Sequence, residues 1–320
     1  MSVLVVGSYN QDHVWRIDRF PQPGETRRGL GFSTGPGGKG FNQAVASARQ
    51  GVPTAFIGAL GGDALARTAR ELAQADGIAT RWQVCDDMST GSCGIVVDAN
   101  GQNQIVLDLA ANERLDAAYV AAQTDLFASA RVVLVQMETG LGAIRAALSS
   151  ANAGCVRLLN PAPVHAELDA GLLALADLVT PNETEFAALL DRCAGTALRA
   201  EAIADCRDDE LHALCRRLGA LSVIVTLGAR GCFVSHADPA RWHDASPGYR
   251  VAAERVHVRD TTGAGDAFNG ALAAELAQRP GRALREAVVH AGRVAALSTE
   301  TAGAAVAMPT RAAVLQRFGL

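Results

Sequence analysis

In one short segment, DTTGAGDAFNG at residues 260–270, Gly263 and Gly265 precede the carboxylate of Asp266 at the start of an apolar helical pattern. The backbone N–H groups of Gly263 to Asp266 can point at an anion at the positive end of that helix. Asp266 would repel such an anion, and its presence is explained if it accepts a proton from a hydroxyl that attacks phosphorus. An ordinary acid in the first turn of a helix is the alternative, and the two glycines favour the catalytic interpretation.

A second glycine-rich segment, GPGGKGFNQ at residues 35–43, places Lys39 and Asn42 beside flexible backbone. It is not a Walker A loop, because Gly40 follows Lys39 where Ser or Thr is required. Its G-x-G-x-x-G spacing does not follow the first predicted strand directly, as a dinucleotide-binding fold requires. The segment therefore predicts either backbone that approaches a small ligand, with two side chains suited to sugar hydroxyls, or a plain turn before a helix.

Polar side chains follow several predicted strands at their carboxyl ends, the edge at which open α/β sheets bind ligands. Asn10 and Asp12 follow the first strand, and Glu138 follows a later apolar run. Asn182 and Glu185 follow another strand, where they can approach Mg²⁺ and phosphate. An Asx turn, a solvent-facing acid and a helix cap are the respective ordinary explanations. These positions are candidate ligand contacts, and the residues alone leave both interpretations open.

Other features limit the chemistry further. The segment TLGARG, residues 226–231, resembles a strand-to-hairpin turn whose backbone is exposed to any nearby nucleotide. The cysteines and the seven histidines show no spacing typical of a zinc site, and no G-x-S-x-G nucleophile elbow is present.

Apolar runs alternate with segments of helical spacing along most of the chain. This alternation predicts a doubly wound, mainly parallel α/β sheet flanked by helices. The expected strands lie at residues 3–6, 54–57, 132–135, 156–159, 178–179 and 223–226. The expected helices lie at residues 42–50, 64–74, 141–151, 184–190, 209–218 and 266–278.

Two stretches, about residues 12–34 and 90–109, break this alternation. Asn100-Gly101 lies between alternating runs, so we predict an antiparallel hairpin from Ser92 to Leu107. We expect the two stretches to form a small β-sheet lid on a single domain of residues 1–320, since no linker or internal repeat divides the chain.

The amino-acid composition limits the kinds of binding partner that this chain is expected to have. The 320 residues carry 29 Lys and Arg against 33 Asp and Glu, a net charge of −4, which does not favour nucleic acid or an anionic membrane. No uncharged apolar run approaches the roughly 18 residues of a membrane span. Seven cysteines without a CxxC pair fit reduced thiols. We therefore expect a cytoplasmic protein that binds small molecules.

Taken together, these segments resemble the ribokinase family of carbohydrate kinases, also called the PfkB family. The likeness runs from VVGS at residues 5–8 to Met308-Pro309, with the motifs in the family's order. GKGFNQA at residues 38–44 is similar to the family's first signature, and DTTGAGD at 260–266 to its second. The resemblance implies a ribokinase-like fold and transfer of phosphate from ATP to the 5-hydroxyl of D-ribose.

The same resemblance implies roles for individual residues. Asp266 would take the proton of the 5-hydroxyl, and Gly263 to Gly265 would form the anion hole. The pentose would be held by Asn10, Asp12, Gly38, Lys39, Asn42, Glu138 and Asp266. Mg²⁺ and phosphate would lie near Asn182 and Glu185. The nucleotide site would include Asn182, Glu185, Thr226, Gly228, Gly231, Gly265 and His290.

Members of the family also use K⁺ as an activator and form homodimers through the lid, and the resemblance extends both expectations to this chain. The matching cation positions are Asp260, Thr262, Ser298, Thr301 and Gly303. Two departures affect the expectation. Ala307 stands where Ser is common near the cation loop, and Phe41 replaces a usual Ala and either crowds the sugar pocket or packs behind it.

Three alternatives remain at this stage. The first is the same chemistry on deoxyribose, fructose, ketodeoxygluconate or a nucleoside. The second is a sugar or nucleotide sensor without catalysis, against which the presence of Asp266 argues. The third is a dehydrogenase, which only the isolated G-x-G-x-x-G supports.

Overall fold

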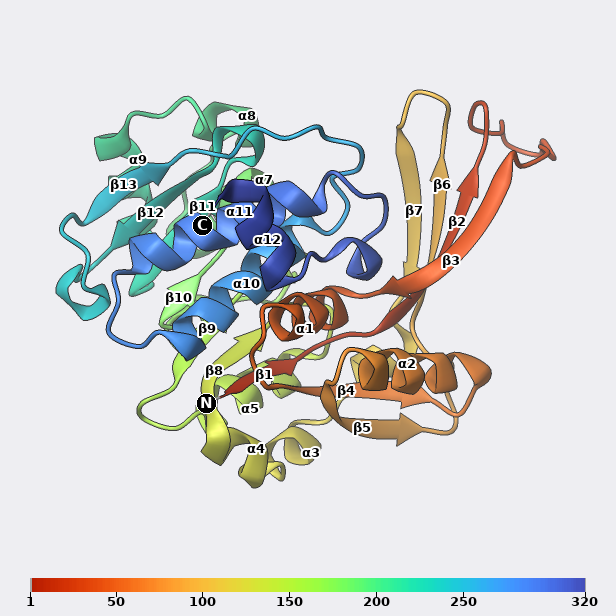
Figure 1. Cartoon of the computed structure of the whole chain (residues 1–320), viewed down its shortest axis with the longest axis horizontal. Coiled ribbons are helices and arrows are strands. Elements are labelled where there is room, and N and C mark those ends of the chain that lie inside the picture. The colour runs from red at the N-terminus through yellow and green to blue at the C-terminus, as the bar shows by residue number, and fades with distance from the viewer. Residues whose placement is uncertain (1, 320) are drawn as a thin grey trace.

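The apolar runs predicted as strands form the interior of a large sheet. The computed structural model describes residues 2–319, and in this part of the chain nine strands pair in the order β13-β12-β11-β10-β9-β8-β1-β4-β5 (Figure 1). Neighbours from β11 through β5 run parallel, whereas β12 and β13 extend the sheet antiparallel. The strands are β1 (Ser2–Val6), β4 (Thr54–Gly61), β5 (Ala79–Cys85), β8 (Ala130–Val135), β9 (Val156–Leu159), β10 (Leu178–Val179), β11 (Ser222–Thr226), β12 (Cys232–His236) and β13 (Gly248–Val251).

Helices cover both faces of this sheet, as the doubly wound prediction requires. Alternate strand residues point to opposite faces, so Val3 and Val5 pack with one helix layer while Leu4 and Val6 pack with the other. The first layer comprises α1 (Lys39–Arg49), α2 (Ala64–Ala75), α10 (Ala264–Gln278), α11 (Leu284–Ser298) and α12 (Arg311–Phe318). The second comprises α3 (Ala117–Ala121), α4 (Thr124–Ser129), α5 (Leu141–Ser150), α6 (Ala170–Leu173), α7 (Glu183–Ala194), α8 (Ala200–Ile203) and α9 (Asp208–Arg217). Short 3₁₀ helices occur at Ala110–Arg114, Gly228–Arg230, Ala240–Trp242 and Ala305–Ala307.

All six predicted strands and all six predicted helices occur, with boundaries that differ by a few residues. The largest difference among the strands is β4, which continues four residues beyond the predicted end at residue 57. The sequence analysis missed β5, β12 and β13. β5 and β13 form the two edges of the sheet and mix exposed polar residues with apolar ones, so they lack the continuous apolar run of a buried strand.

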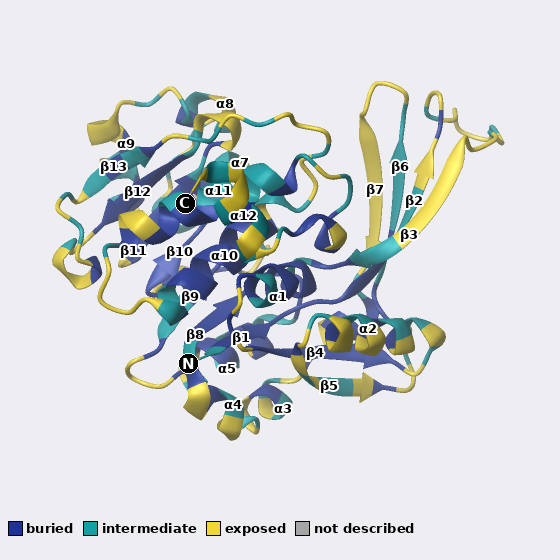
Figure 2. Ribbon diagram, viewed as in Figure 1, coloured by how far each residue is buried: buried dark blue, intermediate teal, exposed yellow. Residues whose placement is uncertain are grey.

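A separate four-stranded sheet, in the order β3-β2-β6-β7, extends away from the large sheet (Figure 1). Its strands are β2 (Asn10–Arg16), β3 (Gly31–Gly37), β6 (Ser92–Val97) and β7 (Asn103–Asp108). The predicted hairpin is confirmed: β6 and β7 pair antiparallel around a turn in which Gly101 has a φ of 79°. Much of β3 and β7 is exposed (Figure 2). Within residues 2–319, no helix is long and apolar enough to cross a bilayer.

Candidate active site

The loop before α1 lies directly against the turn between β1 and β2. Gly38 has a φ of 84°, and a Cβ on it would lie 2.7 Å from the Asn10 backbone nitrogen. A Cβ on Gly40 would lie 2.5 Å from the Ser8 nitrogen. Both positions therefore require glycine, one for its backbone conformation and both for close packing. The glycine-rich segment is a tightly packed element that presents Lys39 and Asn42 at the carboxyl end of β1.

Glu138 fixes this loop from the neighbouring strand. It follows β8, is 7% exposed, and its Oε2 accepts hydrogen bonds from the Ser8 hydroxyl (2.6 Å) and the Lys39 backbone N–H (2.9 Å). The other carboxylate oxygen accepts no hydrogen bond within residues 2–319. Glu138 is therefore a buried acid with one oxygen used for structure and one available to a ligand hydroxyl, and the solvent-facing alternative is wrong for this residue.

Asp266 is buried at the third position of α10 and accepts two side-chain amide hydrogen bonds. Asn42 Nδ2 donates to Oδ2 and Gln43 Nε2 donates to Oδ1, each over 2.9 Å. Burial raises the pKa of Asp266, while Lys39 and the two amide donors oppose that rise and Glu138 adds to it. A carboxylate has about four lone-pair positions, so two amide donors leave sites for a hydroxyl. Asp266 has the environment of a proton acceptor.

The N-terminus of α10 offers free backbone donors beside this carboxylate. Gly263 precedes the helix with a φ of 75°, and the Ala264 N–H bonds back to Thr261 O over 3.2 Å. The N–H groups of Gly263, Gly265 and Asp266 have no acceptor among the residues that the structure describes, as expected where a helix begins. A Cβ on Gly265 would meet no atom within 4 Å. In this part of the chain the helix start therefore faces open space with three unpaired donors.

Lys39 lies among several carboxylates that influence one another. Burial lowers the pKa of Lys39, but Asp266, Glu138 and Glu185 together raise it above its ordinary value. Burial also raises the pKa of Glu185, with Lys39 opposing the rise. The structure thus brings candidate residues from α1, α7, α10 and the segment after β8 within electrostatic reach of one another.

Asp12 is a further buried carboxylate in this crowded region. It lies within β2, so the Asx-turn alternative is wrong. Burial raises its pKa to about 7, with the Glu138 and Asp266 carboxylates adding to the effect. A Cβ on Gly37 would lie 2.3 Å from both Asp12 carboxylate oxygens, so this side chain lies flat against the backbone of β3. At neutral pH Asp12 is near the midpoint of its titration.

This raised pKa predicts a pH-dependent cost to stability. Between the unfolded pKa near 4 and the folded pKa near 7, the folded protein binds more protons than the unfolded one, so the free energy of unfolding falls as pH rises. We expect Asp12→Asn to remove this loss. Calorimetric melting of both proteins should show a variant that is more stable at pH 8, with a difference that shrinks toward pH 5. A difference that is the same at both pH values would contradict the raised pKa.

Asn10 is held by a residue that the sequence analysis missed. Asn112 donates through Nδ2 to Asn10 Oδ1 and to Tyr9 O, each over 2.9 Å, and accepts the Tyr9 N–H through Oδ1. Asn112 is fully buried and lies more than 100 residues along the chain from its partners. It belongs to no motif, so nothing in the local sequence indicates its role. Gln43 was also missed, although it stands inside the first glycine-rich motif.

Phe41 packs into the core behind the glycine-rich segment 35–43 and does not project from it into the space around Lys39 and Asn42. The side chain is fully buried, and its ring makes edge-to-face contacts with Tyr9 (5.1 Å between centroids) and Phe56 (6.0 Å). It belongs to the hydrophobic core between the sheet and the first helix layer. The larger side chain is therefore accommodated by the core.

Asn182 and Glu185 form a complete capping box at the start of α7. The Glu185 N–H donates to Asn182 Oδ1 and the Asn182 N–H donates to Glu185 Oε2, each over 2.8 Å. The helix cap expected for these residues is therefore present. Capping does not exclude a ligand role. Asn182 also forms an isolated parallel bridge with Thr226, which brings the cap next to the hairpin turn.

The turn after β11 is present as predicted. Gly228 and Gly231 have positive φ values of 52° and 86°, and a Cβ on Gly231 would lie 2.0 Å from Val251 O. Close approach to β13 therefore requires glycine at position 231. His290, on α11, places its Nε2 3.0 Å from Gln50 Oε1 at the end of α1.

The five predicted cation positions come together only in part. Asp260 accepts hydrogen bonds from the Thr262 N–H (2.9 Å), the Thr262 hydroxyl (2.7 Å) and the Gly303 N–H (2.9 Å). The Ser298 hydroxyl bonds to its own helix at Ala295 O (2.8 Å). The Thr301 N–H bonds to Ser298 O. Asp260, Thr262 and Gly303 form one hydrogen-bonded cluster, whereas the Ser298 hydroxyl donates its proton within α11 and keeps its oxygen lone pairs.

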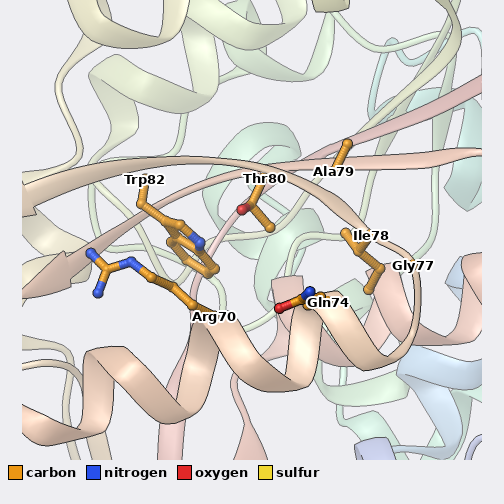
Figure 3. Close-up of a pocket in the computed structure, with 7 residues that line it drawn as sticks. All are labelled: Arg70, Gln74, Gly77, Ile78, Ala79, Thr80 and Trp82. Carbon is orange, nitrogen blue, oxygen red and sulfur yellow. The ribbon is translucent and has the colours of Figure 1, made fainter.

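One shallow surface groove is lined by none of the candidate residues. It comprises about 610 Å³ between α2 and the edge strand β5, and Figure 3 shows the residues that line it. They are Arg70, Gln74, Gly77, Ile78, Ala79, Thr80 and Trp82. No group of three or more His, Cys, Asp or Glu side chains in residues 2–319 is arranged to hold a metal ion.

Known proteins share both the sequence and the fold of this chain. The family model for pfkB family carbohydrate kinase matches residues 1–311. A ribokinase of Haemophilus influenzae is 35% identical over 317 residues, covering 98% of this chain and 97% of the relative. The solved ribokinase of Thermotoga maritima has a TM-score of 0.86 at 30% identity, covering 100% of this chain and 99% of that one.

A third relative has been solved with ligands bound. The structure of Arabidopsis thaliana ribokinase complexed with ribose and ATP has a TM-score of 0.80 at 27% identity, covering 100% of this chain and 99% of that one. The doubly wound sheet with a small separate sheet is thus the fold of solved ribokinases. The chain belongs to the pfkB family of carbohydrate kinases.

Proposed function

We propose that this chain is an ATP-dependent ribokinase, which transfers the γ-phosphoryl group of ATP to the 5-hydroxyl of D-ribose. One observation carries the proposal: the buried Asp266 carboxylate lies beside backbone N–H groups at the start of α10 that have no acceptor within residues 2–319. A proton acceptor and an anion site next to each other suit a hydroxyl that attacks a phosphate. The ribokinases among its relatives favour ribose as the acceptor.

The sugar would bind where acidic and amide side chains face the α1 loop. Asn42 Oδ1 is buried and has no hydrogen-bond partner within residues 2–319, so it is available to accept a sugar hydroxyl. The free oxygen of Glu138, together with Asp12, supplies further acceptors, and Asn10 lies beside Asp12 in β2. Lys39 and the Gly38 backbone line the same loop. A pocket rich in acceptors matches a polyol whose hydroxyls donate.

Phosphoryl transfer follows from this placement. Asp266 accepts the proton of the sugar 5-hydroxyl while the oxygen of that hydroxyl forms a bond to the γ-phosphorus. The bond from that phosphorus to the bridging oxygen breaks, and ADP leaves. The N–H groups of Gly265 and Asp266 bind the oxygens of the transferring group, and Gly263 and Ala264 shape the turn that exposes them.

The ATP that supplies this phosphoryl group would extend from α10 toward the turn at Thr226, Gly228 and Gly231, adjacent to Asn182. His290 remains a candidate nucleotide contact from the sequence alone. A bound Mg²⁺ neutralises phosphate charge and orients the transferring group. Glu185 and Asn182 would approach it, and the lack of a three-residue acidic cluster within residues 2–319 fits an ion held mainly through water and phosphates.

A K⁺ ion would bind at the loop that contains Asp260, Thr262 and Gly303, with Ser298 and Thr301 nearby. Carboxylate and hydroxyl oxygens suit such a hard cation. The Ser298 hydroxyl donates to Ala295 O but keeps oxygen lone pairs that can coordinate a cation, and because position 307 is Ala, backbone carbonyls would supply the remaining ligands. We therefore expect activation by K⁺ that depends on the Asp260 carboxylate.

The four-stranded sheet would serve as the lid and as a dimer contact. Trp15, Phe32 and Val106 are 41%, 57% and 75% exposed, and the strand register places them on one face. Exposed apolar side chains gathered on one sheet face favour a second copy as partner. Lid closure would exclude water that competes for the phosphoryl group. The proposed substrates, ATP and ribose, and the free cysteines favour a cytoplasmic location.

The test is ADP release from MgATP, with and without K⁺, across ribose, deoxyribose, fructose, ketodeoxygluconate and nucleosides. We expect ribose to give the highest kcat/KM and K⁺ to raise it. A preference for another acceptor would keep the phosphoryl-transfer site and reassign the substrate. Sugar binding without ADP release would identify a sensor, and nicotinamide cofactor binding would indicate a dehydrogenase; either result would overturn the proposal.

A further inference from the structure

Gln43 occupies a fully buried position between Asp266 and the carboxyl ends of three strands. Its Nε2 donates one hydrogen bond to Asp266 Oδ1 (2.9 Å) and one to Asn160 Oδ1 (3.0 Å). A primary amide has two N–H donors, and both are used here. Gln43 is thus a fixed donor toward Asp266 that has no remaining N–H for a ligand.

Neighbouring groups determine which way this amide points. Asn160 Nδ2 donates to Thr180 O over 2.9 Å, so Asn160 must present its Oδ1 to Gln43. On the other side, Gln136 Nε2 donates to Gln43 Oε1 over 2.5 Å. Turning the Gln43 amide over would break all three of its contacts and oppose like groups. The orientation that serves Asp266 is therefore imposed by the two acceptors, Asn160 Oδ1 and the Asp266 carboxylate, while Gln136 adds a donor to Gln43 Oε1.

Helix packing keeps Gln43 within reach of Asp266. Gly270 lies one turn further along α10, and a Cβ on it would lie 2.3 Å from Gln43 O and 2.6 Å from the Ala46 Cβ. A larger side chain at position 270 would push α1 and α10 apart. The close approach of the two helices thus sets the distance between the Gln43 amide and the Asp266 carboxylate.

The charged groups around Asp266 come from four other elements. Lys39 on α1 stabilises the carboxylate, whereas Glu138 after β8, Glu185 on α7 and Asp12 on β2 oppose its ionisation. Only two neutral side chains donate to it, Asn42 and Gln43. Asn42 keeps an unpaired Oδ1, so its orientation can respond to a bound sugar. Gln43 has no such freedom.

We propose that Gln43, held by Gln136 and Asn160, is the positioning residue that keeps Asp266 in one orientation and ionised, with its remaining lone pairs directed at the attacking hydroxyl. This inference rests on the proposed function for its catalytic consequence. The hydrogen bond itself makes a prediction that is independent of substrate.

Gln43→Leu keeps the side-chain volume and removes both donors. A hydrogen bond to a charged group is worth about 1.5–3 kcal/mol, so kcat at neutral pH should fall about 10- to 100-fold. The acid limb of the kcat profile should move to higher pH, because the ionised carboxylate has lost a donor. The KM for the sugar should change little. A merely structural role would leave the acid limb in place.

Gln50→Leu is the matched control. Gln50 is also fully buried, directly follows α1, and donates to Pro309 O over 2.9 Å while its Oε1 lies 3.0 Å from His290 Nε2. It should lose stability in the same way as Gln43→Leu without moving the acid limb. An acid limb that shifts equally in both variants would overturn the proposal.

A titration without substrate separates this inference from the proposed function. Carbon-13 NMR of aspartate-labelled protein, with the Asp266 resonance assigned by its loss in Asp266→Asn, reports ionisation directly. We expect Asp266 to titrate at higher pH in Gln43→Leu than in the wild type. An unchanged titration would reject the role of Gln43 even if the kinase is active. A shifted titration in a protein that phosphorylates none of the tested sugars would retain that role and reject the function.

Discussion

Asp266→Asn is expected to lower kcat by about 10²–10⁴-fold, the range typical for loss of a general base. Asparagine preserves the size of the side chain but cannot accept the proton of the 5-hydroxyl. Sugar affinity should be largely kept, because Asn42, Glu138 and Asp12 still face the sugar. ADP release measures the rate, and calorimetry measures sugar binding.

Stability distinguishes this prediction from the helix-acid interpretation. An ordinary first-turn acid stabilises its helix by about 0.3–1 kcal/mol, so its loss would lower the free energy of unfolding and leave kcat unchanged. Burial instead raises the pKa of Asp266, so removing its charge should leave stability unchanged or increase it at neutral pH. Glu286→Gln, in the exposed first turn of α11, is the control for the ordinary case. Near wild-type turnover in Asp266→Asn would exclude Asp266 as the base.

Gly265→Val keeps the backbone N–H of this position but fills the space in front of it, so we expect kcat/KM for ATP to fall by about 10²–10³-fold, an effect as large as the loss of one anion-hole donor. A side chain here enters the open space in front of the α10 N-terminus, where the phosphoryl oxygens would lie. Folding should be nearly unaffected, since a Cβ at this position meets no atom within 4 Å. The expected result is an inactive protein with a melting temperature close to that of the wild type.

Gly142→Val is the matched control for this variant. Gly142 is also the second residue of its helix, α5, and a Cβ there would meet only the Ala117 Cβ at an ordinary 3.7 Å. It tests the effect of valine near a helix start on the opposite face of the sheet. If Gly265→Val turns over ATP as well as Gly142→Val does, the α10 N-terminus is not the phosphate site.

The parts of the site that the sequence predicts are those whose chemistry is local. Gly263, Gly265 and Asp266 share one turn of one helix, so their spacing alone places donors and carboxylate together. The capping box of Asn182 and Glu185 is local in the same way, and the structure contains it. The alternation of apolar runs likewise predicted the sheet, because buried parallel strands are apolar on both faces.

The parts that the sequence does not predict depend on contacts between distant segments. Asn112 reaches Asn10 from about 100 residues away, and Gln136 and Asn160 contact the Gln43 amide from the segments that follow β8 and β9. A single buried Asn or Gln leaves no periodic pattern in the sequence. Its hydrogen-bond partners are known only once the order of the strands in the sheet is known. The edge strand β5 escaped prediction for a related reason, since half-exposed residues dilute its apolar pattern.

The central claim is transfer of the γ-phosphoryl group to the 5-hydroxyl of ribose, and the product tests it most directly. Phosphorus and carbon NMR should follow MgATP incubated with D-ribose and, in parallel, with 5-deoxy-D-ribose, which lacks the accepting hydroxyl. We expect one phosphate monoester on C5 of ribose for each ADP formed, and no ester with 5-deoxyribose even though it competes with ribose for the site. A phosphate ester at another carbon, or ADP formed equally with both sugars, would contradict the claim.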